Sequence, residues 1–129
     1  MITVRPATDK AAWETFLQGR PYASFLQSWT MGEVYRDIGQ EPVRFEAVKD
    51  DRIVGVCQAI LVPARRGRHL MVQYGPQLAD DAALEPLVNA IKEEATKRSC
   101  SFIRMSPFQP DIPNSKFQIP NSVLSPMHL

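Results

Sequence analysis

The sequence has few cysteines, little net charge and no long apolar run. Only two of its 129 residues are cysteines, and 15 basic side chains nearly balance 14 acidic ones. This composition is unlike a disulfide-rich secreted scaffold, and a net charge of +1 gives no argument for binding nucleic acid or an anionic membrane. The longest apolar run has about ten residues, half of what a membrane-spanning helix needs, and no signal peptide is visible. We therefore expect one soluble, cytoplasmic domain.

Signatures of covalent catalysis are also missing. The two histidines, His69 and His128, lie far apart, and neither stands near a serine or cysteine in a recognisable motif. The sequence thus shows no nucleophile–base pair, and we expect no metal ion and no bound cofactor. Cys57 falls in an apolar run, which favours a buried, unreactive thiol. Cys100 sits at the end of a predicted helix, and a disulfide between the two cysteines stays open.

The stretch from Pro42 to Pro76 reads as three successive β-strands. Apolar and polar side chains alternate over residues 43–47 and again over residues 70–74, as in strands with one covered face. Between them, Ile53–Val62 is almost continuously apolar and rich in β-branched residues, which predicts a central strand covered by helices on both faces. The polar segment Lys49–Arg52 predicts a turn that makes the first two strands antiparallel neighbours.

Three helices are expected around this core. The first follows Thr8 or Asp9 and runs through Gln18, the second follows Ser28 and ends at Gly39, and the third runs from Asp81 to Arg98. Each has an apolar stripe that should face the core, formed by Trp13, Phe16 and Leu17, by Met31, Val34, Tyr35 and Ile38, and by Leu84, Leu87, Val88, Ile91 and Ala95. Three further aromatic residues are expected to pack in the core: Phe25, Trp29 and Phe45.

Two further strands, Ile2–Arg5 and Ser101–Met105, complete an α/β (α+β) fold with a mixed sheet flanked by helices. The second of them should run parallel to the strand that ends at Tyr74, with a right-handed crossover through the third helix. Residues 1–106 form the compact part of a single domain. Residues 107–129 contain five prolines and no periodic apolar stripe, so we expect an irregular segment that leads toward a strand the chain lacks.

Four short motifs occur in order along these elements: SFLQSW at Ser24–Trp29, DRIVGV at Asp51–Val56, YGP at Tyr74–Pro76 and IRMSP at Ile103–Pro107. With this series the chain resembles the FemABX peptidoglycan-bridge aminoacyltransferases. Members of that family resemble two tandem GNAT-like acyltransferase domains, so the resemblance implies a GNAT-like sheet and makes this chain most of the first domain. Ser106 departs from the family pattern, which commonly has an aspartate before the proline.

The resemblance implies transfer of an amino acid from aminoacyl-tRNA to an amine on the stem peptide of a peptidoglycan precursor, either lipid II or its nucleotide-linked form. The amine would attack an activated ester directly, so the reaction needs positioning and oxyanion stabilisation but no covalent enzyme intermediate. The implied partners are aminoacyl-tRNA and the precursor, with peripheral contact to the inner membrane face. A chain of this length is expected to be too short to complete the reaction alone.

Four residues are candidates for contacting the substrate: Gln73, Tyr74, Arg36 and Arg104. Gln73 and Tyr74 end a strand before Gly-Pro, where α/β proteins place ligands. Tyr74 fits a core aromatic with its hydroxyl at the rim equally well. Arg36 could bind a precursor phosphate, although a surface arginine is the simpler interpretation. Arg104 could meet a carboxylate, but we favour a structural ion pair with Glu46.

The only dense basic cluster, Arg65–His69, joins two predicted strands. The phosphate-cradling loop of acetyl-CoA-dependent GNAT enzymes runs instead from a strand into a helix N-terminus, so we interpret the cluster as a solvated loop. Three functions stay open. The favoured one is an aminoacyltransferase or a fragment of one. The others are a small-molecule N-acyltransferase that uses acyl-CoA, and a non-catalytic precursor-binding domain or inactive remnant.

Overall fold

The structure, a computed structural model, describes residues 1–20, 25–64 and 67–106. Its elements in chain order are β1 (Thr3–Pro6), α1 (Lys10–Gln18), the 3-10 turn η1 (Phe25–Gln27), α2 (Trp29–Asp37), β2 (Pro42–Lys49), β3 (Arg52–Ala64), β4 (Gly67–Gln73), β5 (Gln77–Leu78), the 3-10 turn η2 (Asp81–Ala83), α3 (Leu84–Lys97) and β6 (Phe102–Ser106). The proline-rich segment 107–129, predicted to be irregular, lies outside the described residues.

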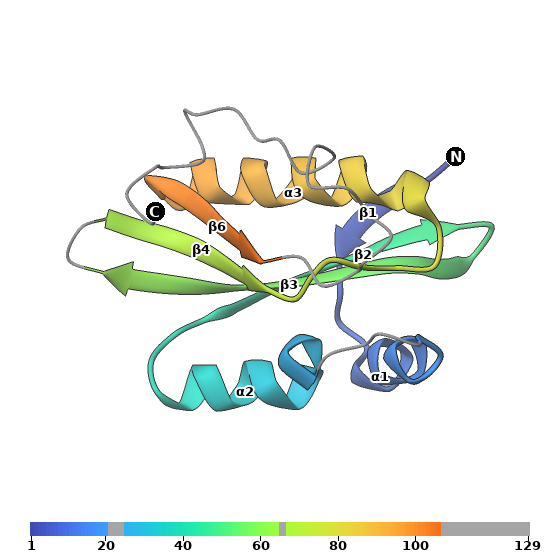
Figure 1. Ribbon diagram of the computed structural model, residues 1–129, viewed down its shortest axis with the longest axis horizontal. Helices are drawn as coiled ribbons and strands as arrows, with labels where there is room; N and C mark the ends of the chain where they lie inside the picture. Colours follow the sequence, from blue (N-terminus) through green and yellow to red (C-terminus); the bar gives the residue numbers. More distant parts are fainter. Residues whose placement is uncertain (21–24, 65–66, 107–129) are drawn as a thin grey trace.

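The strands form one mixed sheet with β3 at its centre (Figure 1). The order is β1-β2-β3-β4-β6, and β5 pairs with β3 off this path. All pairs are antiparallel except β4 and β6, which run parallel with His69 opposite Phe102 and Gln73 opposite Ser106. The predicted mixed sheet, its central strand and the parallel partnership of β4 with the last strand are therefore confirmed.

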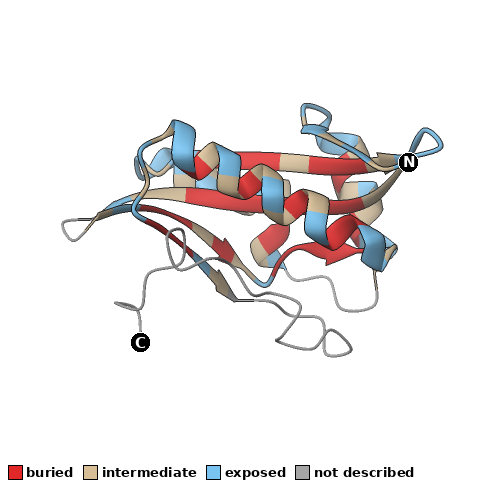
Figure 2. Cartoon of the chain, turned by 90° about the horizontal axis from the view of Figure 1, so that it is seen from above, coloured by how far each residue is buried: buried red, intermediate tan, exposed pale blue. Residues whose placement is uncertain are grey.

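Helices cover both faces of the sheet, with α3 on one side and α1 and α2 on the other (Figure 1). The main apolar core lies between α3 and the sheet, and seen from above α3 alternates between buried and exposed positions along its length (Figure 2). A smaller cluster of Trp13, Leu17 and Val56 lies under α1. Cys57 is buried in the main core, where desolvation raises the pKa of its thiol to about 12, and both cysteines are free thiols.

The first two predicted helix starts and the predicted turn form where the sequence places them, whereas the third helix, predicted from Asp81, begins with the 3-10 turn Asp81–Ala83 and becomes α-helical at Leu84. Asp9 caps α1 by accepting from the Ala12 N–H, and Ser28 caps α2 by accepting from the Met31 N–H. The β2–β3 hairpin turns through Asp50 and Asp51, both with positive φ, as a two-residue turn of the primed kind requires. None of the helices in the described residues is long and apolar enough to cross a bilayer.

The apolar stripe predicted for α2 does not face the core. Ile38 is 67% exposed and Val34 is also exposed, while the buried residue of the helix is Gly32. A Cβ on Gly32 would come within 2.3 Å of the Gln58 side chain, so α2 packs closely on polar groups of the sheet. Phe25, predicted to pack in the core, is 71% exposed. The prediction failed because periodicity locates an apolar face but not the surface that it meets.

The basic cluster also differs from the predicted solvated loop. Its last three residues, Gly67 to His69, belong to β4, and β3 continues through Pro63 to Ala64. The His69 ring is buried and stacks on Phe102 of β6, with ring centres 4.4 Å apart. The tip of this hairpin, residues 65–66, lies outside the described residues.

Candidate functional site

The ladder between β3 and β4 stops at Ile60 and Met71, two residues before β4 ends. The chain then turns through Tyr74, whose φ is +55°, and through a cis peptide bond before Pro76. It returns as β5, which pairs with an earlier part of β3. The sheet therefore has a gap between β3 and the end of β4.

The side chain of Gln27, at the end of η1, fills this gap. Its Nε2 donates to the carbonyl oxygens of Gln58 at 3.1 Å and of Gln73 at 2.8 Å, and its Oε1 accepts from the Gln58 N–H at 2.9 Å. The residue has no exposed surface. A Cβ on Gly75 would come within 2.7 Å of the carboxamide, so the turn after β4 needs a glycine at that position.

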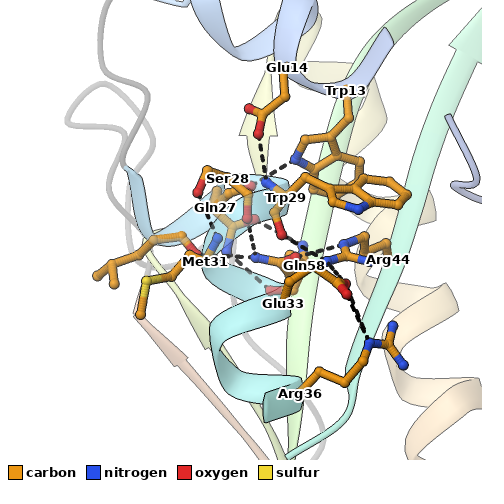
Figure 3. A network of polar contacts seen from close by, with 11 residues as sticks. Trp13, Glu14, Gln27, Ser28, Trp29, Met31, Glu33, Arg36, Arg44 and Gln58 are labelled. Carbon is orange, nitrogen blue, oxygen red and sulfur yellow. Dashed lines mark hydrogen bonds and ion pairs between the residues drawn. The ribbon is translucent and has the colours of Figure 1, made fainter. Parts of the chain in front are cut away.

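A polar layer between the sheet and α2 holds Gln27 in place (Figure 3). The Gln58 side chain donates from Nε2 to the Ser28 carbonyl oxygen at 2.9 Å and accepts at Oε1 from Arg44 Nε at 2.8 Å. The Arg44 guanidinium lies over the Trp29 ring, 3.8 Å from its centre. The loop that carries Gln27 is thus tied to β2 and β3 through side chains.

Arg44 is the buried charge of this layer, and its side chain is 6% exposed. Its Nη2 donates to the Trp29 carbonyl oxygen and to Glu33 Oε2, both at 2.9 Å. The hydrogen bond from Arg44 is the main cause that lowers the pKa of Glu33 below its usual value, and Arg36 adds to it. Burial lowers the pKa of the Arg44 guanidinium, while the bond to Glu33 opposes that shift.

Two contacts from α1 fix the same loop. Trp13 Nε1 donates to the Gln27 carbonyl oxygen at 2.8 Å, and Glu14 Oε1 accepts from the Trp29 N–H at 3.1 Å. The rings of Trp13 and Trp29 meet edge to face with their centres 5.9 Å apart. The segment from η1 into α2 is therefore held by α1, β3 and β4 together.

Gln73 and Tyr74 stand at the end of β4, as predicted from the sequence. Gln73 Oε1 accepts from the Tyr35 hydroxyl at 2.9 Å, so this side chain is turned toward α2. The Tyr74 carbonyl oxygen accepts from Gln77 Nε2 at 2.7 Å, which closes the turn. With 40% of its surface exposed, Tyr74 is not a core aromatic, and that alternative is excluded.

Arg104 is exposed on β6, where it lies opposite Met71 of β4. Paired residues face the same side of a sheet and alternate residues share a face, so Arg104 and Gln73 are both on the α2 side. The predicted ion pair between Arg104 and Glu46 is wrong. Glu46 pairs with Arg5 at 2.6 Å, and β3 and β4 separate its strand from β6.

Arg36 lies apart from the other three candidates. Its Nε donates to Glu33 at 3.2 Å, and its side chain lines an open hollow beside the start of β2, together with Arg44 and Arg98. All three arginines of this hollow pair with glutamates, so it offers little uncompensated positive charge. The structure places Gln73 and Tyr74 at the end of β4 and Arg104 in the middle of the neighbouring strand β6, on the face that Gln73 shares, and leaves Arg36 elsewhere.

The segments that could cradle a phosphate are poorly suited to one. The basic cluster joins β3 to β4 and leads into no helix, as predicted. Before α3, Asp80 Oδ1 accepts from the Ala82 N–H at 2.9 Å, and this bond, with Lys49 nearby, lowers the pKa of the Asp80 carboxyl. The Asp80 carboxylate therefore occupies the position before α3 that a bound phosphate would take. No cluster of three or more possible metal ligands occurs within the described residues.

Three of the residues that build this site were not singled out by the sequence: Gln27, Gln58 and Arg44. Gln58 did carry a signal, because it is the one polar side chain within the apolar run Ile53–Val62. A buried amide in a central strand must find partners, which is a reason to expect a polar network beside it. Nothing local in the sequence indicates that Gln27 is the partner.

Comparison with known proteins gives a family match that covers most of the chain. A model described as the FemAB family matches residues 8–118. This range includes all four motifs noted in the sequence. No curated protein matches the chain.

Solved structures share the fold at low sequence identity. FemX is 20% identical over 81% of this chain, with a TM-score of 0.71, and the matched part is 27% of FemX. A ribosomal-protein-alanine N-acetyltransferase from Brucella melitensis biovar Abortus 2308 is 15% identical over 91% of this chain and 86% of its own, with a TM-score of 0.65. A protein from Clostridium acetobutylicum described as a predicted acetyltransferase, solved with acetyl-CoA, is 12% identical over 92% of this chain and 90% of its own, with a TM-score of 0.60. The acetyltransferase-like α/β fold expected from the sequence is therefore observed.

Proposed function

The chain belongs to the FemAB family, and on that premise we propose that it acts in aminoacyl transfer to a peptidoglycan precursor. The family match over residues 8–118 carries this proposal. The arrangement of the motifs supports it, because motifs far apart in sequence meet at the end of β4. Gln27 of the first motif lies against Gly75 of the third, and Ser106 of the fourth is paired with Gln73.

The reaction would join an amine of the stem peptide to the carbonyl carbon of an aminoacyl-tRNA ester, with the tRNA hydroxyl as leaving group. Such a reaction depends on holding the two groups together and on donors for the oxyanion. We assign the acceptor peptide to the end of β4 and β6. There the Tyr74 hydroxyl and the Gln73 amide would bond peptide groups, and Arg104 would meet a stem-peptide carboxylate.

The wider partners follow from this assignment. The donor is aminoacyl-tRNA and the acceptor is the lipid-linked or nucleotide-linked precursor, which sets the reaction in the cytoplasm or at the inner membrane face. The matched part of this chain covers 27% of FemX. We therefore assign to this chain only one wall of the site, the wall that faces the acceptor. Arg36 is not assigned to this wall, because it bonds to Glu33 and lines the hollow beside the start of β2.

The fold is compatible with an enzyme that uses acyl-CoA, but the segment before α3 is poorly suited to binding the CoA pyrophosphate. Acetyltransferases of the same fold are among the structural neighbours. A CoA pyrophosphate needs free N–H groups at a helix N-terminus. Before α3 the Ala82 N–H is bonded to Asp80, and the N–H groups of Ala79 and Asp80 both donate to the Val54 carbonyl oxygen.

The test is transfer of a labelled amino acid from a panel of aminoacyl-tRNAs to the nucleotide-linked precursor, catalysed by the full-length protein. We expect labelled precursor with at least one aminoacyl-tRNA. Arg104→Gln should raise the KM for the precursor about tenfold, because the loss of one charged hydrogen bond weakens binding by about that factor. Arg52→Gln, the same change at the distant β2–β3 turn, should leave the KM unchanged. Transfer of acetyl from acetyl-CoA, with no transfer from any aminoacyl-tRNA, would refute the proposal.

A further inference from the structure

The hydrogen-bond register shows what Gln27 replaces. Ile60 is opposite Met71 in the β3–β4 ladder, so two residues further on Gln58 would be opposite Gln73. In an antiparallel ladder, hydrogen-bonded pairs recur every two residues and exchange two N–H···O bonds. Gln58 and Gln73 instead bond to the carboxamide of Gln27, which stands between them.

We propose that Gln27 is a positioning residue whose side chain acts as an inserted strand residue and sets the place of the turn Tyr74–Pro76. A carboxamide has the groups of a peptide unit and one additional N–H. Two carbonyl oxygens require both donors, and the Gln58 N–H requires the acceptor, so the orientation of the amide is fixed by its partners. Both N–H donors and the acceptor oxygen are used in a fully buried location.

The consequence of the insertion is that the end of β4 stays away from β3. If Gln58 and Gln73 bonded directly, the β4 end would move into the space now held by the amide. Gly75 already lies against that amide, with its virtual Cβ at 2.7 Å, so the turn rests on Gln27 and not on β3. Gln73 keeps its bond to Tyr35, and Tyr74 remains at the surface.

The position of Gln27 is itself built from several elements. Trp13 Nε1 donates to the carbonyl oxygen of Gln27. The Gln58 side chain donates to the carbonyl oxygens of the two flanking residues, Leu26 and Ser28. The contacts of Trp13 with Gln27 and of Gln58 with Ser28 are drawn together in Figure 3. The role in catalysis rests on the proposed function, whereas the role in placing the turn does not.

The first test compares Gln27→Met with Gln18→Met, the same change at an exposed position of α1. In NMR spectra of the 129-residue chain, Gln27→Met should shift the amide signals of Tyr74 and Gly75 far more than Gln18→Met does. Equal shifts in the two variants would overturn the proposal. If the turn moves, the KM for the precursor should rise about tenfold with kcat nearly unchanged. A moved turn with an unchanged KM would remove only the catalytic role.

The second test uses Gln27→Glu and keeps the proposal falsifiable if Gln27→Met does not fold. A carboxylate would face two carbonyl oxygens and should displace the turn at neutral pH, because like partial charges repel. The protonated acid has one donor and one acceptor. The amide signals of Tyr74 and Gly75 should therefore return toward wild-type positions as the pH is lowered. Signals that stay at wild-type positions at every pH would contradict the assignment.

Discussion

Arg44 connects the sheet to α2 through two hydrogen bonds and a stacked indole, and a third hydrogen bond joins it to Gln58 of β3. Replacing Arg44 with Met should lower the free energy of unfolding by about 3 kcal/mol, since Gln58 Oε1 and the Trp29 carbonyl oxygen lose their donor in a buried layer. Arg36→Met is the matched control. It removes the exposed partner of the same Glu33, and should cost less than about 0.5 kcal/mol. Equal losses in urea denaturation would contradict this account of Arg44.

The same ion pair makes acid stability depend on Glu33. Arg44 and Arg36 hold the pKa of Glu33 below its usual 4.5 in the folded state. A carboxyl group with a depressed folded pKa stabilises fully above its unfolded pKa, and this contribution is lost as the pH falls through the folded pKa. Glu33→Gln should therefore flatten the decline in melting temperature below pH 4.5. An unchanged decline would show that Glu33 does not contribute.

Among the helices, α2 gives the sharpest test of packing. Gly→Ala within a helix usually stabilises a protein by about 1 kcal/mol. At Gly32 the new Cβ would lie 2.3 Å from Gln58 Oε1 and 2.4 Å from Arg44 Nη2. Gly32→Ala should therefore destabilise the chain by about 2 kcal/mol. Thr30→Ala, at an exposed position of the same helix, should change stability by less than about 0.5 kcal/mol. A stabilised Gly32→Ala variant would mean that α2 does not sit on this layer.

Asp51 is not the residue that best stabilises the β2–β3 turn. Its φ is +64°, a conformation that favours glycine in the second position of a primed turn. Asp51→Gly should therefore raise the free energy of unfolding by about 0.5 kcal/mol. Asp37→Gly, the same change at the end of α2, should lower it by a similar amount. Both effects can be read from urea midpoints, and a destabilised Asp51→Gly variant would be inconsistent with this turn geometry.

The sequence predicted these elements unequally well. Strands and caps depend on local patterns, so β3, the Asp50–Asp51 turn and the caps of α1 and α2 were predicted correctly. The direction of the apolar side of α2 was not, because the helix rests on Gly32 and the polar pair of Arg44 and Gln58. A period of 3.6 cannot reveal that a helix packs on buried amides and a guanidinium.

For the molecule as a whole, the fold was more predictable than the site. The order of strands and helices fixed a mixed sheet, and four motifs indicated the family. The site depends on Gln27 reaching β3 and β4 over sequence separations of 31 and 46 residues. Such contacts leave no local pattern. The same limit explains why Arg104 was paired with Glu46, on a strand that proved to be separated from β6 by two others.

The proposed function depends most on where a stem-peptide precursor binds. NMR amide shifts of the 129-residue chain, followed as the nucleotide-linked precursor is added, measure this directly. The account predicts that the largest shifts fall on Gln73 and Tyr74, at the end of β4, and on Arg104 of the neighbouring strand β6. Acetyl-CoA at the same concentration should leave these signals unmoved. Shifts confined to the start of α3 or to the β2–β3 turn, or a response to acetyl-CoA alone, would contradict it.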